Sequence, residues 1–558
     1  MTTRTTTSSN DSIRLLPPQR TKARKLALAA LALAPFLVGL LALYLGQDTN
    51  WDFRNYHWYN AYAFLNGRYG FDLLPSQMPY FYNPALDVPY FLLASHTPVM
   101  FANFVLSSVQ GLNFVLLFML AHAALIIPNA RQKVWVCALL ALLGLMGGGS
   151  IAQIGTTFYD NITSLGLFLS ALLVLKNFKR LMNAKAGSAL VLALLCGLPA
   201  GLMMGFKLPA VVFCAGLCGA ILFVTGPLTR RVWIAFGFGL GITLGAALTM
   251  GPWAYFLYSH YGSPLFPYYN NVFNSPLLPP INLQDIQFRP YGLHDRAFFP
   301  FIFAKYPHRV GEVPWRDLRI PILYVALPLC AMIALAFGRN KNAPDRAAVF
   351  FASRYLLWAA ALSYAAWLFL FAIYRYLIPL EMLAPLLIVL ALGLLPIKPP
   401  MRALLTAFML VLIAATLQPG DWGRRGLWMD KAVEISGPSL ANLKNEKNLM
   451  ILMAGYSPYS HVVPEFPPEI PFVRIQSNFT APDNGYAFND LIKARVLSHS
   501  GSYKLLIPDY DKSRASDALR HLNLAFLPQS CQPVLDHLNY DSQLQLCDVK
   551  HTTPSVKP

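Results

Sequence analysis

Residues 26–46 read LALAALALAPFLVGLLALYLG, a run without a charged residue that follows a basic segment at residues 20–25. A helix of about twenty predominantly apolar residues crosses the hydrocarbon core of a bilayer, so this run is long enough to span a membrane. A cleaved signal peptide is the alternative. Because the run lacks an A-x-A-like end, we expect it to be retained as the first transmembrane helix.

Ten further apolar runs bring the expected number of spans to eleven, and the composition agrees with this. Of the 558 residues, 56% are apolar and 13% are charged, whereas about a quarter of the residues are charged in an ordinary soluble protein. The two short runs on either side of Lys207 are open to another interpretation, in which residues 188–224 form one long helix and a re-entrant piece. The ten runs are residues 99–127, 134–154, 161–175, 189–204, 209–224, 232–258, 320–337, 355–373, 376–395 and 403–417.

Basic residues in the short loops predict the orientation of these helices. With eleven spans and a cytoplasmic N-terminus, every short basic loop falls on the cytoplasmic side, as the positive-inside rule requires. The net charge of +18 is scattered over these loops without a continuous stripe, so no nucleic-acid partner is expected. We expect a multi-pass protein of the inner (plasma) membrane. The residues that set the orientation are Arg4, Arg14, Arg20, Lys22, Arg24, Lys25, Arg131, Lys133, Lys176, Lys179, Arg180, Lys185, Arg230, Arg231, Arg339, Lys341, Arg346, Arg354, Lys398 and Arg402.

The predicted fold class is an all-α polytopic membrane domain followed by a small α/β domain outside the cytoplasm. Residues 1–25 form a basic cytoplasmic N-terminus, and residues 26–417 form the membrane domain. Its two long extracytoplasmic loops are residues 47–98 and 260–319, and residues 418–558 form the α/β domain.

The α/β domain is predicted from short apolar runs. Strand-like runs at residues 449–454, 471–476 and from residue 504 accompany a helical stretch near residues 489–498. Cys531 and Cys547 are the only cysteines of this domain. An oxidising exterior permits a disulfide between them, and two unrelated thiols are the alternative.

An acidic residue stands just outside the first span, in WDFRNYH at residues 51–57. A carboxylate at the membrane surface is partly desolvated, which raises its basicity, so Asp52 can accept a proton from a hydroxyl. The aromatic residues around it are typical of an interfacial belt. Anchoring does not explain an acid beside Arg54, Asn55 and His57, so Asp52 is a candidate catalytic base and His57 a further catalytic candidate.

Three more charged residues lie at the outer ends of expected spans: Asp160, Lys207 and Arg375. Asp160 could support catalysis or cap the first turn of its helix. Lys207 and Arg375 could hold a phosphate by charge-assisted hydrogen bonds. Snorkelling to the interface is the alternative for Lys207, and a structural contact with Glu381 is the alternative for Arg375.

Taken together, these motifs resemble the GT-C superfamily of membrane glycosyltransferases, which includes protein O-mannosyltransferases and lipid A aminoarabinose transferases. The matching features are WDFRNYH at residues 51–57, FYDN at 158–161, GFKLPA at 205–210, YGSPLFPYYN at 261–270 and RYLIP at 375–379. The resemblance covers residues 26–417. The acidic position of the first loop departs from the adjacent Asp and Glu often seen in such enzymes, because Asp52 is followed by Phe53.

The resemblance implies an inverting transfer of a sugar from a polyprenyl-phosphate donor to a glycan, lipid or protein acceptor on the outer face. Asp52 would be the general base, and Asp160 would support the acceptor or a divalent cation, the one cofactor considered. Lys207 and Arg375 would hold the leaving phosphate, with Tyr376, Arg54 and Asn55 as further substrate-binding candidates. The alternatives are a lipid-linked saccharide flippase, an O-antigen-type polymerase and a non-catalytic membrane assembly protein.

Overall fold

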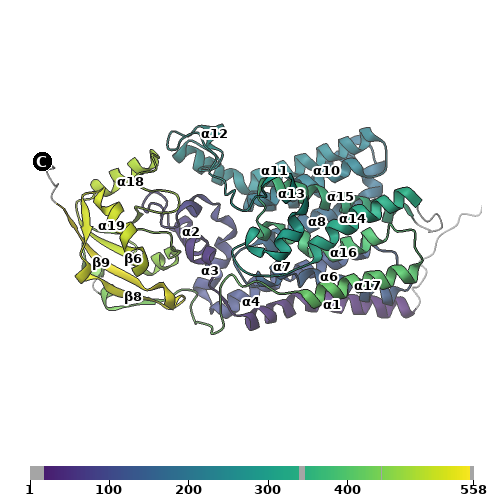
Figure 1. The fold of residues 1–558 in the computed structure, drawn as a ribbon, viewed down its shortest axis with the longest axis horizontal. Helices are drawn as coiled ribbons and strands as arrows, with labels where there is room; N and C mark the ends of the chain where they lie inside the picture. Colours follow the sequence, from purple (N-terminus) through teal and green to yellow (C-terminus); the bar gives the residue numbers. More distant parts are fainter. Residues whose placement is uncertain (1–17, 338–345, 442, 553–558) are drawn as a thin grey trace, which may run out of the picture.

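The computed structural model describes residues 18–337, 346–441 and 443–552. A long bundle of helices forms one end of the molecule and a sheet domain forms the other, with the helices of the first loop between them (Figure 1). Arg4, Arg14, Arg339 and Lys341, which contribute to the orientation argument, lie outside the described residues.

The bundle consists of long, strongly apolar helices. They are α1 (Pro18–Leu45), α4 (Val99–Gln110), α5 (Leu112–Ala124), α6 (Ala130–Leu145), α8 (Asp160–Asn183), α9 (Ala186–Phe206), α10 (Val211–Ala220), α11 (Leu228–Tyr261), α14 (Arg319–Phe337), α15 (Arg346–Leu370), α16 (Ile378–Leu392) and α17 (Pro399–Thr416).

Among the described residues, eight helices are long and apolar enough to cross a membrane. They coincide with eight of the eleven predicted spans. The other three predicted runs correspond to α6 with the short α7 (Gly148–Ala152), to the shorter apolar segment Leu208–Phe223, and to α15. The fold is compatible with a multi-pass membrane protein.

The chain breaks at Lys207, between α9 and α10. Helix α9 ends at Phe206, and a 3-10 turn at Leu208–Ala210 that contains Pro209 precedes α10. The two helices have different partners, because α9 packs along α11 and α8 whereas α10 packs against α15. Residues 188–224 therefore form two separate segments, and whether the second one, Leu208–Phe223, spans the membrane or is the re-entrant piece of the alternative stays a prediction.

Small residues allow α9 and α11 to approach each other closely. A Cβ atom built on Gly201 would lie 2.2 Å from the carbonyl oxygen of Ile242, and one on Gly241 would lie 2.0 Å from that of Leu194. Contacts this short exclude a side chain, as is usual where apolar helices pack backbone to backbone. Lys207 follows α9, and another loop follows Tyr261 at the end of α11. Both segments lie at the same end of the bundle.

The C-terminal domain is built on a seven-stranded mixed sheet, which confirms the predicted small α/β domain. The strand order is β3-β8-β9-β6-β4-β5, with β7 also pairing with β9. Strand β4 is parallel to β5 and β6, and all five of its residues are buried, which explains its uninterrupted apolar sequence. The elements are β3 (Ile435–Ser436), β4 (Leu449–Met453), β5 (Phe472–Arg474), α18 (Phe488–Leu497), β6 (Ser502–Pro508), α19 (Lys512–Arg520), β7 (Leu524–Phe526), β8 (Gln532–Asp536) and β9 (Leu544–His551).

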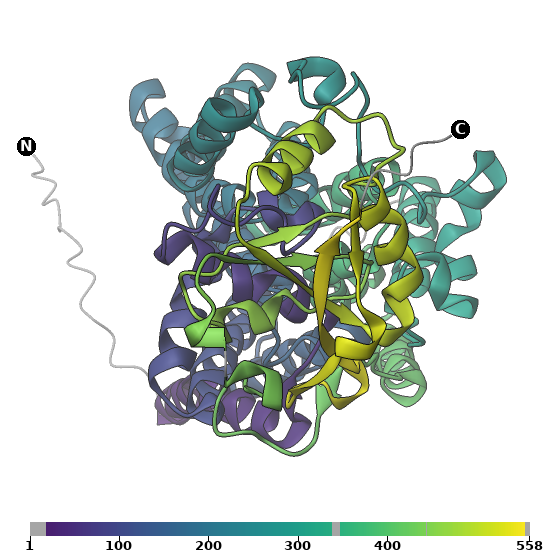
Figure 2. The ribbon, with the colours of Figure 1, turned by 90° about the vertical axis from the view of Figure 1, so that its left-hand side faces the viewer.

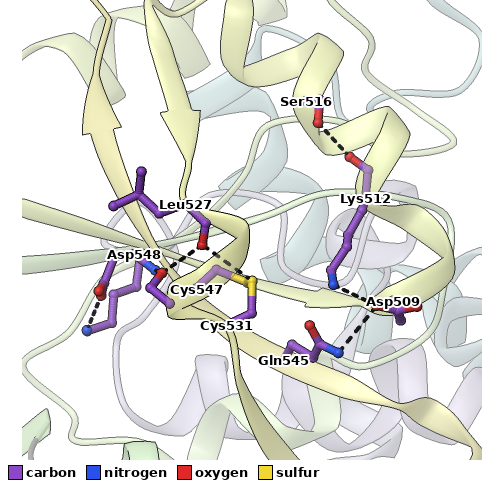
Figure 3. The surroundings of a disulfide bond; sticks show 10 residues. Asp509, Lys512, Ser516, Leu527, Cys531, Gln545, Cys547 and Asp548 are labelled. Carbon is purple, nitrogen blue, oxygen red and sulfur yellow. Dashed lines mark hydrogen bonds and ion pairs between the residues drawn. A yellow bond between two sulfur atoms is a disulfide. The ribbon is translucent and has the colours of Figure 1, made fainter.

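A disulfide links Cys531, just before β8, to Cys547 in β9 (Figure 3). The two strands are antiparallel neighbours, so the bond closes the chain across one strand pair. The predicted pairing of these cysteines is confirmed, and the alternative of two unrelated thiols is wrong.

The first loop joins the bundle to the sheet domain. It carries α2 (Trp58–Leu65) and α3 (Val88–His96), which lie behind the sheet when the molecule is seen from that end (Figure 2). Leu73 pairs with Val473 as a parallel bridge at the outer strand of the sheet. Asp72 accepts hydrogen bonds from Arg68 and from the amide of Phe472. The loop is thus fixed to the sheet by buried polar contacts.

The aromatic residues of the first loop belong largely to this interface. Tyr59 is completely buried, its hydroxyl donates a hydrogen bond to Asp72, and it packs in one core with residues of β4 and β6. Tyr56 and Trp58 are also buried. The interfacial-belt interpretation is therefore wrong for these three side chains, because protein contacts bury them. Tyr59 packs in the core of the sheet domain, Trp58 packs against Phe91, and Tyr56 packs against His57 and Tyr82.

Candidate functional site

A cavity of about 320 Å³ lies where the first loop, α9, α11 and the start of α16 meet. Five of the residues predicted from the sequence line it: Asp52, His57, Lys207, Arg375 and Tyr376. They come from three segments far apart in the chain. Asp160 does not line the cavity but lies directly behind Lys207.

A π-helical turn, Phe53–His57, positions the first group. The amide of Trp58 donates to the carbonyl of Phe53, five residues earlier, in the wide i→i+5 pattern that occurs often at functional sites. Because the turn is wider, Tyr56 and His57, which are four and five positions after Asp52, both lie on the same side of the helix as Asp52. The Tyr56 hydroxyl donates to Asp52 Oδ2 at 3.2 Å, and His57 lines the same cavity.

Asp52 forms an ion pair with Arg375. Arg375 Nη1 lies 2.8 Å from Asp52 Oδ2, and both side chains are largely buried. Burial by itself would raise the pKa of Asp52, but the charge of the neighbouring Arg375 holds this pKa below its usual range. The Asp52 carboxylate is thus paired with a cation at the wall of the cavity.

Arg375 makes its other contacts within the same cavity. Arg375 Nη2 lies 3.6 Å from Glu312 Oε1, and the guanidinium stacks over Phe158 at 4.4 Å. The predicted alternative, a structural contact with Glu381, is wrong. The Glu381 carboxylate instead accepts hydrogen bonds from the amides of Gly149 and Ser150 and from the Ser150 hydroxyl.

Lys207 forms a second ion pair, with Asp160. Lys207 Nζ lies 2.7 Å from Asp160 Oδ1 and donates to the carbonyl of Phe158. The other carboxylate oxygen of Asp160 accepts from Gln153. Tyr159, not Asp160, is the N-cap of α8, so the capping alternative for Asp160 is wrong. Snorkelling does not describe Lys207 either, because its ammonium is turned toward a buried carboxylate.

The sequence did not point to a third acid, Asp87. Its Oδ1 lies 2.7 Å from His57 Nδ1, and both side chains are buried. Burial raises the pKa of Asp87, and its contact with His57 opposes this rise. Asp87 precedes α3 in the second half of the first loop, 30 residues after His57. Like Asp52, it is an acid of the first outside loop that interfacial anchoring does not explain, and this signal could have found it.

No protein-family model matches the chain, and no curated protein matches its sequence. The chemistry of the cavity therefore has to be interpreted from its own residues.

Arg54 and Asn55 do not line the cavity, contrary to their predicted role in substrate binding. They lie on the opposite side of the π-helical turn, where it meets the sheet domain. The Asn55 amide contacts Ser76 and Gln77, and Arg54 Nε donates to the carbonyl of Thr49. The backbone carbonyls of residues 54 and 55 also bind His461 and Ser460. These contacts place both residues in the attachment of the sheet domain.

Aromatic side chains form much of the remaining wall. The Tyr82 and Tyr268 hydroxyls are 2.6 Å apart and join the first loop to the segment after α11. Tyr376 lies beneath Lys207, with its ring centroid 5.6 Å from Nζ. Such a wall offers apolar faces and hydroxyls together to a bound ligand.

The described residues of this cavity do not form a set of metal ligands. Among the described residues, no group of three or more His, Cys, Asp or Glu side chains is arranged to hold a metal ion. Asp52 and Asp160, the predicted pair, are each bound to a different basic side chain.

Proposed function

We propose that this protein is an inverting glycosyltransferase that moves a sugar from a polyprenyl-phosphate donor to an acceptor hydroxyl. The observation that carries the proposal is the pairing of Asp52 with Arg375 in a cavity that also contains Lys207. A basic carboxylate and two cations are the groups that removal of a hydroxyl proton and departure of a phosphate require. The resemblance of the motifs to GT-C enzymes supports the same assignment.

The proposed reaction is a single displacement. The acceptor oxygen forms a bond to the anomeric carbon of the sugar while its proton passes to the Asp52 carboxylate. The bond between the anomeric carbon and the phosphate oxygen breaks, and its electron pair leaves with the polyprenyl phosphate. Arg375 and Lys207 stabilise the charge of that phosphate, which is where negative charge develops during the reaction.

The proposed setting is the outer face of the inner membrane. Eleven spans with a cytoplasmic N-terminus place the cavity, both long loops and the sheet domain on this side, in agreement with the positive-inside rule. A lipid-borne donor requires no nucleotide-sugar site. The acceptor is a glycan, a lipid or a protein segment that reaches the cavity beside the first loop.

A transfer assay with the full chain in lipid nanodiscs tests the proposal. The donors are undecaprenyl phosphates that carry single hexoses or pentoses, and the acceptor is a glycan and lipid extract of cells lacking the protein. We expect release of undecaprenyl phosphate, and a product sugar with inverted anomeric configuration by NMR. Arg520→Ala, on an exposed helix of the sheet domain, is the control variant.

The outcome of this assay distinguishes the transferase from the alternative functions. Binding of undecaprenyl phosphate without transfer from any donor would reject the transferase and favour a flippase for lipid-linked saccharides. A product with retained configuration would reject the single displacement. Absence of both binding and transfer would leave the assembly protein as the better interpretation.

A further inference from the structure

We infer that Asp87 is a positioning residue that fixes the His57 ring so that Nε2 accepts a hydrogen bond from a hydroxyl of the acceptor substrate. The inference rests on the proposed function and adds a residue pair that recognises the acceptor. In this arrangement a non-reacting hydroxyl of the acceptor is bound by His57, while the neighbouring hydroxyl that attacks the sugar loses its proton to Asp52.

The geometry of the pair leaves one ring nitrogen available. His57 Nδ1 lies 2.7 Å from Asp87 Oδ1, and the two side chains are 7% and 6% exposed. A carboxylate only accepts hydrogen bonds, so Nδ1 carries a proton, and in the neutral form of the ring Nε2 is left as an acceptor. Nε2 is buried and has no hydrogen-bond partner within the described parts of the chain.

Aromatic neighbours hold the ring in place. The Tyr56 ring centroid is 4.0 Å from that of His57, and Tyr159 packs edge-on against the imidazole at 5.2 Å. Rotation of the ring would break the Asp87 contact and displace both tyrosines. The unpartnered nitrogen is therefore held at a fixed position in a residue that lines the cavity.

The Asp87 carboxylate is not used to cap a helix. Asp87 precedes α3 with helical backbone angles, and its side chain accepts no hydrogen bond from an amide of the first turn. A buried polar atom without a partner costs free energy, so the unpartnered Nε2 of His57 favours a role in ligand binding.

The charges around His57 favour a hydroxyl as the ligand group. The Asp87 carboxylate contacts Nδ1, and the nearby Asp52 carboxylate is paired with Arg375. A carboxylate next to the ring disfavours an anionic ligand group there. A non-reacting sugar hydroxyl can donate to Nε2 while a neighbouring hydroxyl presents its oxygen for attack.

Three variants test the inference: Asp87→Asn, His57→Gln and His57→Phe. The asparagine amide can donate to Nδ1, which would reverse the tautomer and make Nε2 a donor. We expect Asp87→Asn to lower kcat/KM for the extract acceptor by roughly 10- to 100-fold, as is usual when the partner of an oriented histidine is removed. Undecaprenyl phosphate affinity should not change. Asp483→Asn, in the exposed pair with His521, is the matched control.

A double-mutant cycle asks whether Asp87 acts through His57. Glutamine places an acceptor oxygen near the position of Nε2, so His57→Gln should remain at least tenfold more active than His57→Phe. Adding Asp87→Asn to His57→Gln should then cost little, because coupled residues are not additive. Fully additive losses, or equal losses for the glutamine and phenylalanine variants, would overturn the inference. The second comparison stands even where Asp87→Asn does not fold.

The ring itself can be observed without any substrate. In protein labelled with ¹⁵N-histidine, the signal that disappears in His57→Gln belongs to His57. It should show a protonated Nδ1 and an unprotonated Nε2, and Asp87→Asn should change it. An Nε2-protonated ring in the unaltered protein would reject the inference alone, whereas the absence of any sugar transfer would reject the proposed function.

Discussion

Arg375 Nη1 lies 2.8 Å from Asp52 Oδ2, although the two residues are 323 positions apart in the chain. The proposed function gives both of them a task, since Asp52 accepts a proton and Arg375 holds the leaving phosphate. A donor phosphate would therefore compete with Asp52 for the same guanidinium. Donor binding would free the carboxylate at the moment when a base is needed.

Asp52→Asn preserves the shape of the side chain while removing its basicity. If Asp52 takes the acceptor proton, turnover should fall by about 10²- to 10⁴-fold, the usual contribution of a positioned general base. Undecaprenyl phosphate binding should persist, because Lys207 and Arg375 remain. Turnover and binding are measured separately in nanodiscs, and near-normal turnover would reject Asp52 as the base.

Arg375→Ala removes a charge-assisted contact to the phosphate and leaves Asp52 without its partner. We expect undecaprenyl phosphate to bind about 10- to 100-fold more weakly, which corresponds to roughly 1.5–3 kcal/mol for a hydrogen bond to a charged group. Titration with undecaprenyl phosphate measures this affinity. Undiminished affinity would show that Arg375 serves only to neutralise Asp52.

The pH dependence of kcat/KM should report the same ion pair. The pKa of Asp52 in the free protein is held low by Arg375 against the effect of burial, so the carboxylate remains ionised to low pH. With Arg375→Gln, burial is less strongly opposed and the pKa rises. The acid limb of kcat/KM should therefore move to higher pH than in the unaltered protein. A limb that stays in place or moves to lower pH would contradict this assignment.

The topology prediction places the C-terminal region outside the cytoplasm. Alkaline phosphatase fused at Pro554 should be active, and the same reporter placed in the basic loop at Lys133 should be inactive. Activity is compared at equal expression. The reverse pattern would overturn the orientation together with the proposed setting of the cavity.

The disulfide between Cys531 and Cys547 should stabilise the sheet domain. The cysteines are 16 residues apart, and the chain-entropy model values a closed loop of about 15 residues at roughly 3 kcal/mol. Reduction should lower the unfolding temperature of this domain in the full chain. The variant with serine at both positions should start from the lower value and should not respond to the reductant. If the reductant lowered the unfolding temperature of both proteins equally, the disulfide would not be the source of the stabilisation.

The sequence predicted the helices well because span length and hydropathy are local properties. It did not predict α13 (Gly292–Lys305) in the second long loop, where apolar, aromatic and charged residues alternate without a clear period. In the sheet domain, the buried run of β4 was identified, whereas β8 and β9 were not. Three of the five residues of β8 and three of the eight residues of β9 are exposed, so their pairing depends on the sheet more than on their own composition.

The sequence predicted residues of the candidate site where a charged residue stood at the outer end of an expected membrane span. Asp52, Lys207 and Arg375 were chosen for that reason, and the structure places them in one cavity. Asp87 was missed because its partner lies in another part of the loop. Arg54 and Asn55 were assigned by their closeness to Asp52 in sequence, but a helical turn has two sides and theirs faces the sheet domain.

The π-helical turn Phe53–His57 makes the length of this segment as important as its composition. One side presents Asp52, Tyr56 and His57 to the cavity, and the other gives the carbonyls of residues 54 and 55 to the sheet domain. Deleting one residue would tighten the turn and rotate both sides at once. Related sequences can therefore exchange side chains within this turn, but an insertion or deletion there would uncouple the reacting groups from the domain that anchors them.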